Sequence, residues 1–215
     1  MKRLNLLITV FLCSFFINAA LFSQVRVACI GNSITYGATI KNRSVDSYPA
    51  QLGRILGPGW EVKNFGVSGT TLLKKGNSPY INQKAYQEAL DYQPNIVIIK
   101  LGTNDSKPVN WKYKSEFESN YVELVNTFKG LKTKPEIWLC LPVPCFETKW
   151  GINDSVIHGE IIPLVKKVAR KTRSKLIDLY TPLTGKPEMF NDGIHPNPQG
   201  AGIIAKEIAS KIRKN

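Results

Sequence analysis

The segment Gly31-Asn32-Ser33-Ile34-Thr35 follows an apolar run, Val25-Arg26-Val27-Ala28-Cys29-Ile30. Such a run is typical of a buried strand, which places Ser33 at the carboxyl end of that strand. In an open parallel sheet, ligands bind at the carboxyl ends of the strands. Ser33 is therefore a candidate nucleophile, and it needs a base, an orienting acid and donors for an oxyanion.

Strands and helices alternate along the rest of the chain. Four further segments predict strands: Trp60–Phe65, Asn95–Leu101, Glu136–Leu141 and Lys175–Tyr180. Helices are expected over Tyr48–Leu56, Ile81–Tyr92, Lys114–Leu131, Ser155–Arg173 with a break near Pro163, and Gly200–Arg213. This alternation predicts an α/β fold, a three-layer α/β/α sandwich whose five-stranded parallel sheet is covered by helices on both faces.

The N-terminus has the pattern of a secretory signal peptide. Lys2 and Arg3 precede the apolar run Leu6–Ile17, and small residues follow it. We interpret residues 1–24 as the signal peptide, cleaved between Ala19 and Gln24, and residues 25–215 as one domain. A membrane anchor is the alternative, but the run is short for a bilayer span. Export to the periplasm or the extracellular space is expected, without stable membrane insertion after cleavage.

Charge and cysteine content narrow the functional classes. The net charge is +13, and it becomes +11 once Lys2 and Arg3 are removed. A basic surface could bind nucleic acid, but the sequence contains no nucleic-acid motif, so none is expected as a partner. Of the cysteines after residue 24, Cys29 fits a core strand, whereas Cys140 and Cys145 flank Leu-Pro-Val-Pro and could pair. No metal-ligand spacing appears.

The sequence has two histidines, and His195 is the candidate base. It lies on a loop three residues after Asp192, a spacing that lets the carboxylate reach one ring nitrogen and leaves the other free to face Ser33. His158 lies in a helical segment and is expected to be a solvated surface residue. Asp192 and His195 together with Ser33 are the predicted catalytic residues.

Acyl transfer also requires donors that face the developing oxyanion. The side-chain amide of Asn104, after the third strand, can supply one. The backbone N–H groups of Gly69 and Ser33 can supply two more, and a glycine lets the backbone approach closely. The alternative interpretations are a turn glycine at Gly69 and an Asx turn at Asn104.

Four sequence blocks resemble those of the SGNH (GDSL-type) hydrolases. They are Gly31-Asn32-Ser33-Ile34-Thr35, Asn64-Phe65-Gly66-Val67-Ser68-Gly69, Gly102-Thr103-Asn104-Asp105 and Asp192-Gly193-Ile194-His195-Pro196. The resemblance implies a flavodoxin-like fold and ester hydrolysis through an acyl-enzyme, with Ser33, Asp192 and His195 as the triad. It also implies an oxyanion hole of Ser33, Gly69 and Asn104, and no metal or organic cofactor.

One residue departs from the family pattern. Asn32 stands where the first block usually has Asp, and we expect a local effect on the hydrogen bonds of the loop without loss of activity. An α/β-hydrolase fits less well, because its nucleophile elbow requires Gly-x-Ser-x-Gly, and the sequence around Ser68 ends in Thr70.

Within the family, the run Ile99–Pro108 and the segment Trp150-Gly151-Ile152 resemble secreted bacterial carbohydrate esterases, sialate O-acetylesterases in particular. Trp111 and Trp150 follow predicted strand ends and are candidates for stacking on a sugar. A carbohydrate O-acetylesterase acting on O-acetylated sialic acid, a small-molecule or glycan ester, is therefore the leading hypothesis. The alternatives are a lipase or thioesterase for longer acyl chains, an acetylxylan or pectin esterase, and a catalytically idle carbohydrate-binding protein. The oligomeric state stays open.

Overall fold

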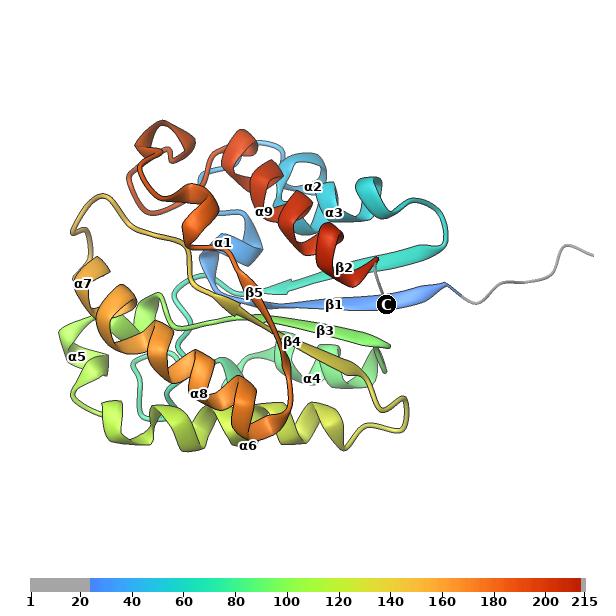
Figure 1. The fold of residues 1–215 in the computed structure, drawn as a ribbon, viewed down its shortest axis with the longest axis horizontal. Coiled ribbons are helices and arrows are strands. Elements are labelled where there is room, and N and C mark those ends of the chain that lie inside the picture. Colours follow the sequence, from blue (N-terminus) through green and yellow to red (C-terminus); the bar gives the residue numbers. More distant parts are fainter. Residues whose placement is uncertain (1–23, 214–215) are drawn as a thin grey trace, which may run out of the picture.

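A computed structural model describes residues 24–213 of the chain. Five strands form one parallel sheet in the order β2-β1-β3-β4-β5 (Figure 1). This is the flavodoxin-like order, and it confirms the predicted fold. The strands are β1 (Val25–Gly31), β2 (Trp60–Gly66), β3 (Ile96–Lys100), β4 (Glu136–Leu141) and β5 (Lys175–Asp178). Each lies within two residues of its predicted bounds.

Helices cover both faces of the sheet (Figure 1). On one face lie α2 (Arg43–Asp46), α3 (Tyr48–Leu56) and α9 (Pro198–Ile212). On the other lie α4 (Lys84–Asp91), α6 (Phe117–Lys129) and α8 (Ile162–Thr172). Each layer encloses its own apolar cluster. Both faces of the inner strands are therefore buried, which explains why β3 is apolar at four consecutive positions.

Short helical segments occupy the strand-end loops. They are α1 (Ser33–Tyr36), α5 (Pro108–Trp111) and α7 (Asp154–Val156), with 3₁₀ turns at Tyr80–Asn82, Asn104–Ser106, Lys114–Glu116, Thr181–Leu183 and Pro187–Met189. A π-helical turn, Ile157–Ile161, directly precedes α8. Pro163 is the second residue of α8, so the interruption expected near Pro163 takes the form of a change from π-helical to α-helical hydrogen bonding and not of a gap in the helix.

The strand register aligns the loops that carry the sequence blocks. Gly31 pairs with Gly66 on one side and with Lys100 on the other. The segments that follow β1, β2 and β3 therefore leave the sheet at the same level. A side chain at Gly31 or Gly66 would collide with Thr35 or with the backbone of α1, so both glycines allow α1 to pack directly against the sheet.

Cys140 and Cys145 do not form a disulfide; Cys29, Cys140 and Cys145 are all free and buried. Cys140 belongs to the apolar cluster beneath α3 and α9, whereas Cys145 belongs to the cluster on the opposite face. The two thiols thus lie on different sides of the sheet, and the pairing considered from their spacing is wrong.

The predicted signal peptide lies outside the described residues, apart from Gln24. Between residues 24 and 213, no helix combines the length and the apolar character needed to cross a membrane.

Candidate active site

A chain of hydrogen bonds connects Ser33, His195 and Asp192. The Nε2 atom of His195 lies 2.9 Å from Ser33 Oγ, and Nδ1 lies 2.8 Å from Asp192 Oδ2. An ionised carboxylate only accepts hydrogen bonds, so the ring proton belongs on Nδ1. Nε2 is then left as the acceptor for the Ser33 hydroxyl. Ser33 and His195 are each 8 % exposed, and the loops after β1 and β5 bring them together.

The backbone of the same loop fixes the carboxylate. Asp192 Oδ1 accepts the N–H groups of Ile194 at 3.0 Å and His195 at 2.7 Å, while Gly193 between them has φ of +78°. Burial by itself raises the pKa of Asp192. Hydrogen bonds from the His195 ring and from the two backbone N–H groups outweigh it and hold that pKa below its usual value. Asp192 is therefore ionised at neutral pH and orients the imidazole.

Ser33 begins helix α1, and Asn32 caps that helix. The Oδ1 atom of Asn32 accepts the N–H of Ile34 at 3.1 Å, so the amide retains the acceptor that the more usual Asp would provide. Asn32 is fully buried, and its Nδ2 group has no partner within residues 24–213. The replacement of the usual Asp by Asn32 thus has a local consequence: an amide group without a hydrogen-bond partner lies beside the candidate nucleophile.

The loops after β2 and β3 bring the candidate oxyanion donors together. Asn104 is 3 % exposed, and its Nδ2 group donates to the carbonyl of Thr70 at 3.0 Å, which leaves its second amide hydrogen available. The backbone N–H groups of Ser33 and Gly69 donate to no acceptor in the described part of the chain. Gly69 has φ of +83°, and a Cβ atom there would meet nothing within 4 Å. Its backbone conformation therefore favours glycine, and its N–H is without an acceptor in the described residues.

Two buried side chains that the sequence analysis did not single out join these loops. The Asp105 carboxylate accepts the N–H groups of Leu72 at 3.0 Å and Leu73 at 2.8 Å. Asn110 donates to the carbonyl of Asn104 at 2.8 Å and accepts the N–H of Asn77, on the loop after β2, at 2.8 Å. Burial raises the pKa of Asp105 to about 6, against the lowering effect of its backbone hydrogen bonds. Asp105 directly follows Asn104, and that adjacency was the signal available in the sequence.

Trp150 lies at the rim of this site. It is 63 % exposed, and its ring centre is 5.7 Å from that of His195. The loop that carries it is joined to the loop of Asp192 and His195, because Phe146 N–H donates to the Gly193 carbonyl at 2.7 Å and Lys149 Nζ to the Asp192 carbonyl at 3.0 Å. At its other end Asn153 N–H donates to Ser106 Oγ at 3.0 Å. The loop therefore spans from the Asp192–His195 segment to the segment after Asn104.

Trp111 and His158 lie outside this site. Trp111 is only 7 % exposed and packs edge-on against Phe117 at 5.4 Å between ring centres. Its ring is part of the core, so the expectation that it stacks on a sugar is wrong. His158 is exposed on the π-helical turn and stacks on Tyr180 at 5.0 Å. Across residues 24–213, no group of three His, Cys, Asp or Glu side chains could hold a metal ion.

A family model for GDSL-like lipases and acylhydrolases matches residues 29–203. This span contains all the candidate catalytic residues and oxyanion donors described above. The chain belongs to this GDSL-like acylhydrolase family. Membership places it among the hydrolases of carboxylic esters. It also accounts for the agreement between the four sequence blocks and the loops that meet at the carboxyl end of the sheet.

Known proteins resemble the chain in sequence and in fold. An acetylxylan esterase of Xylanibacter ruminicola is 46 % identical over 207 residues, which cover 88 % of this chain and 43 % of that protein. The chain thus spans less than half the length of this curated relative. A carbohydrate acetylesterase of Sinorhizobium meliloti superimposes with a TM-score of 0.73 at 22 % identity, covering 89 % of this chain and 99 % of the other. The aryl esterase of M. smegmatis in its inhibitor-bound form reaches 0.73 at 18 % identity, with coverage of 88 % and 98 %.

Proposed function

We propose that this acylhydrolase removes acetyl groups from carbohydrates through an acyl-enzyme. The hydrogen-bonded chain from Ser33 through His195 to Asp192 carries this proposal. Ser33 Oγ attacks the ester carbonyl carbon while His195 Nε2 accepts the hydroxyl proton. His195 then returns the proton to the leaving alcohol, and a water molecule releases the acid from Ser33 by the same route.

The oxyanion that forms in both steps needs hydrogen-bond donors. The N–H groups of Ser33 and Gly69 and the free amide hydrogen of Asn104 are the donors we assign to it. Asp105 and Asn110 support this role by bonding the loop after β3 to Leu72, Leu73 and Asn77 of the loop after β2. Because these donors are fixed before substrate binds, little free energy is lost in reorganising them in the transition state.

The acetylated carbohydrate is supported by the relatives and by one side chain. The relative at 46 % identity is named an acetylxylan esterase, which favours acetylated xylan as the first substrate to test. Trp150 presents an exposed aromatic ring beside His195, a position suited to stacking on the sugar that carries the ester. The alternative hypothesis is a lipase or thioesterase, which would prefer esters of longer acyl chains.

O-acetylated sialic acid is the second candidate substrate. Its support is the net charge, +13 for the full chain and +11 without Lys2 and Arg3, because a basic surface attracts an anionic sugar in a salt-dependent way. An acetate-release assay should compare acetylated xylan, acetylated pectin fragments, O-acetylated sialic acids and triglycerides. Preference for octanoyl over acetyl esters would refute the acetylesterase proposal.

The triad itself is tested with a simple ester. Ser33→Ala and His195→Ala should each remove nearly all turnover of nitrophenyl acetate, and the double variant should be little worse than either, because the residues act as one unit. Near-normal turnover by purified Ser33→Ala protein would show that another residue is the nucleophile.

A further inference from the structure

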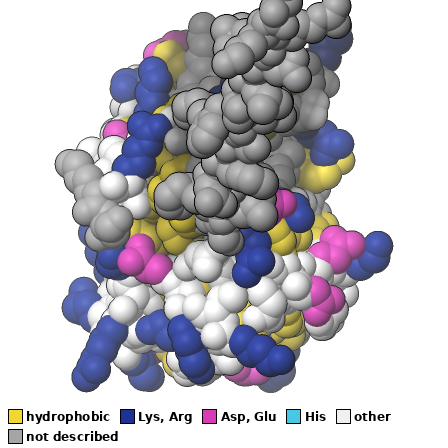
Figure 2. Space-filling model, turned by 90° about the vertical axis from the view of Figure 1, so that its right-hand side faces the viewer, with side chains coloured by type: hydrophobic (Ala, Val, Ile, Leu, Met, Phe, Trp, Pro, Cys, Tyr) yellow, Lys and Arg dark blue, Asp and Glu magenta, His cyan; other side chains and the backbone are white. Residues whose placement is uncertain are grey.

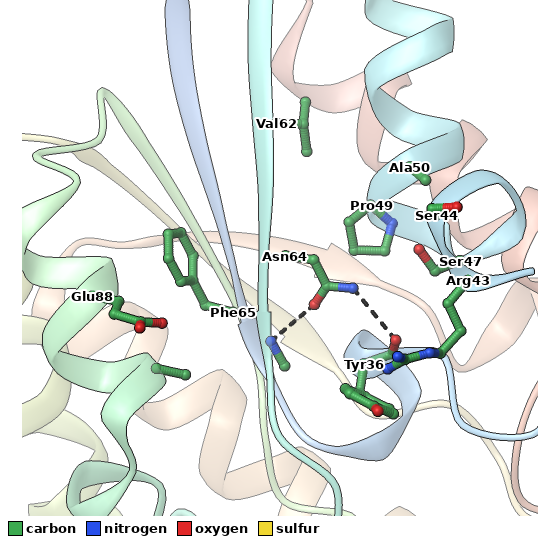
Figure 3. A pocket seen from close by; sticks show the side chains of 12 residues that line it. Tyr36, Arg43, Ser44, Ser47, Pro49, Ala50, Val62, Asn64, Phe65 and Glu88 are labelled. Carbon is green, nitrogen blue, oxygen red and sulfur yellow. Dashed lines mark hydrogen bonds between the residues drawn. The ribbon is translucent and has the colours of Figure 1, made fainter.

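A pocket of about 570 Å³ opens beside the outer edge of β2, and the proposed triad does not use it. It lies between α2 and α3 on one side and α4 on the other (Figure 3). Tyr36, which contributes to its wall, is the last residue of α1, and Ser33 is the first. The pocket therefore adjoins the helix that carries the candidate nucleophile, and its volume is within the range usual for ligand sites.

Arg43 supplies this pocket with a cation that is already oriented. Its guanidinium carbon lies 3.7 Å from the centre of the Tyr36 ring, and within residues 24–213 no carboxylate pairs with it. Stacking on a ring leaves the N–H groups in the plane of the guanidinium free. Their fork matches the two oxygens of a carboxylate.

Ser47 adds an unused hydroxyl. The residue is 2 % exposed and lines the pocket (Figure 3). It precedes α3, but its side chain makes no capping hydrogen bond, and no other partner holds it in the described part of the chain. The Ser47 hydroxyl is not among the buried polar atoms that lack a partner in the described residues, so solvent reaches it in the pocket and a polar ligand group can hydrogen-bond to it.

Asn64 fixes the floor of the pocket to α1. Its Nδ2 group donates to the carbonyl of Thr35 at 2.8 Å, and its Oδ1 accepts the N–H of Gly66 at 2.9 Å. Figure 3 draws the Gly66 bond and the longer one to the Tyr36 carbonyl. A ligand in the pocket would thus rest on the backbone that supports Ser33.

The acidic residue that lines the pocket is remote from Arg43. Glu88 belongs to α4 and lies on the opposite side of β2 from Arg43 (Figure 3), and its carboxylate pairs with Lys84 Nζ at 3.0 Å. The part of the pocket around Tyr36, Arg43 and Ser47 therefore carries a net positive charge together with a free hydroxyl. Such a combination suits a ligand that has both a carboxylate and hydroxyl groups.

We propose that this pocket is an accessory subsite for a carboxylate-bearing sugar residue of the substrate glycan. The carboxylate binds the guanidinium of Arg43, and a sugar hydroxyl binds Ser47. The proposal rests on the carbohydrate esterase function proposed above, since it describes how the same substrate extends beyond the ester. A uronic acid and a sialic acid share this chemistry, and the experiment distinguishes them.

The direct test is a titration of the wild-type chain with D-glucuronate, N-acetylneuraminate and glucose, followed by NMR. At least one acid should bind in the millimolar range, and glucose should bind more weakly. Arg43→Gln should weaken the acid about tenfold or more, because it removes a charge-assisted pair. Arg43→Lys, which keeps the charge without the planar fork, should fall between the two. Arg170→Gln is the matched control: Arg170 lies on α8, across the sheet, and this variant should bind as the wild type does.

The outcomes separate the candidate ligands. Arg43-dependent binding of glucuronate alone assigns the subsite to uronic acids, and binding of N-acetylneuraminate alone assigns it to sialic acids. Equal binding of glucose and the acids, no binding of either acid, or unchanged binding by Arg43→Gln would overturn the proposal. If the wild type releases no acetate from any sugar ester, the esterase function fails instead, and the titration still reports on the pocket.

Discussion

Asn104 is the residue whose chemical role is most sharply testable. One of its amide hydrogens is engaged with the Thr70 carbonyl, and we assign the other to the oxyanion. Loss of one such donor costs about 10²–10³ in turnover. Asn104→Ala should therefore lower kcat sharply with a modest change in KM, because the bond strengthens in the transition state. Steady-state kinetics on nitrophenyl acetate measure both, and a change confined to KM would make Asn104 a ground-state contact.

Lys100 is a residue whose effect on stability can be tested, because its amine is fully buried. Its Nζ lies 3.4 Å from Thr103 Oγ1, and no carboxylate pairs with it within the described residues. Burial lowers the pKa of Lys100 from 10.5 to about 7. Between pH 7 and 10.5 the unfolded chain therefore binds more protons than the folded one, so the contribution of Lys100 to stability rises with pH across that window.

Lys100→Met should remove this dependence. At pH 7 the variant should be more stable than the wild type, by a few kcal/mol at most, since one pKa unit corresponds to about 1.4 kcal/mol. Near pH 10 the difference should be smaller. Urea denaturation at the two pH values measures both free energies of unfolding. An Lys100→Met variant that is less stable than the wild type by the same amount at both pH values would contradict the assignment of a buried, unpaired amine.

Sequence reasoning reached some residues of the site and not others, for a physical reason. Asp192 and His195 are three positions apart, and Ser33 directly follows a strand, so local spacing was enough to select them. The contacts of Asp105 with Leu72 and Leu73 join segments more than thirty residues apart. Trp111 was misjudged because its burial depends on Phe117 and on the packing of α6. Such contacts depend on the tertiary fold.

At the scale of elements, apolar periodicity was a reliable guide to long segments and a poor one to short segments. The bounds of β4 agree with the sequence prediction, and α6 begins only three residues later than expected. Helices α1, α2 and α5 were missed because each has only four residues, too few for a helical period to appear. Capping by Asn32 and the loop packing at Gly31 and Gly66 hold α1 in place.

The loop that carries Trp150 contains a strained residue. Trp150 has φ of +53° and is followed by Gly151 at +78°, and a bulky residue with positive φ is unfavourable. At an ordinary position Gly is less stable than Ala, but where φ is positive the order reverses. Trp150→Gly should therefore be more stable than Trp150→Ala by up to about 1 kcal/mol. Both variants should lose kcat/KM on acetylated sugars more than on nitrophenyl acetate.

Thermal unfolding of the two Trp150 variants, together with kinetics on both esters, checks this expectation. If Ala is the more stable replacement, the backbone at position 150 relaxes and carries no strain. If both esters are affected equally, the ring of Trp150 acts on His195 rather than on the sugar.

At the scale of the whole molecule, one face shows how part of the positive charge is arranged. Figure 2 views the end of the molecule opposite the candidate site, at the amino ends of the strands, and Lys and Arg side chains are scattered over its visible part with fewer acidic ones between them. Attraction of an anionic glycan by the net charge alone is weak at physiological salt. A local group such as Arg43 is needed to select an acidic sugar.

The fold also bears on the predicted cleavage site of the signal peptide. Strand β1 begins at Val25 and is paired with β2 and β3 on its two sides. Its first residue donates its N–H to the Gly59 carbonyl at 2.9 Å, and Gln24 Nε2 donates to the Pro58 carbonyl at 2.7 Å. Removal of residues beyond Gln24 would shorten a central strand that leads directly to Ser33. Cleavage between Ala19 and Gln24 would leave the strand whole.

We therefore predict that the mature protein begins between Ala19 and Val25 and is found outside the cytoplasm. The Lys2-Arg3 head and the Leu6–Ile17 run support recognition for export, and the position of β1 makes Val25 the latest residue at which we expect the mature chain to begin. N-terminal sequencing and intact mass of protein recovered from its native host measure the cleavage position. A chain that keeps Met1 in the cytoplasmic fraction would contradict export. A mature N-terminus beyond Val25 would contradict the predicted cleavage range. Such a chain would have a shortened β1, and a loss of esterase turnover would show that the shortening disturbs the site.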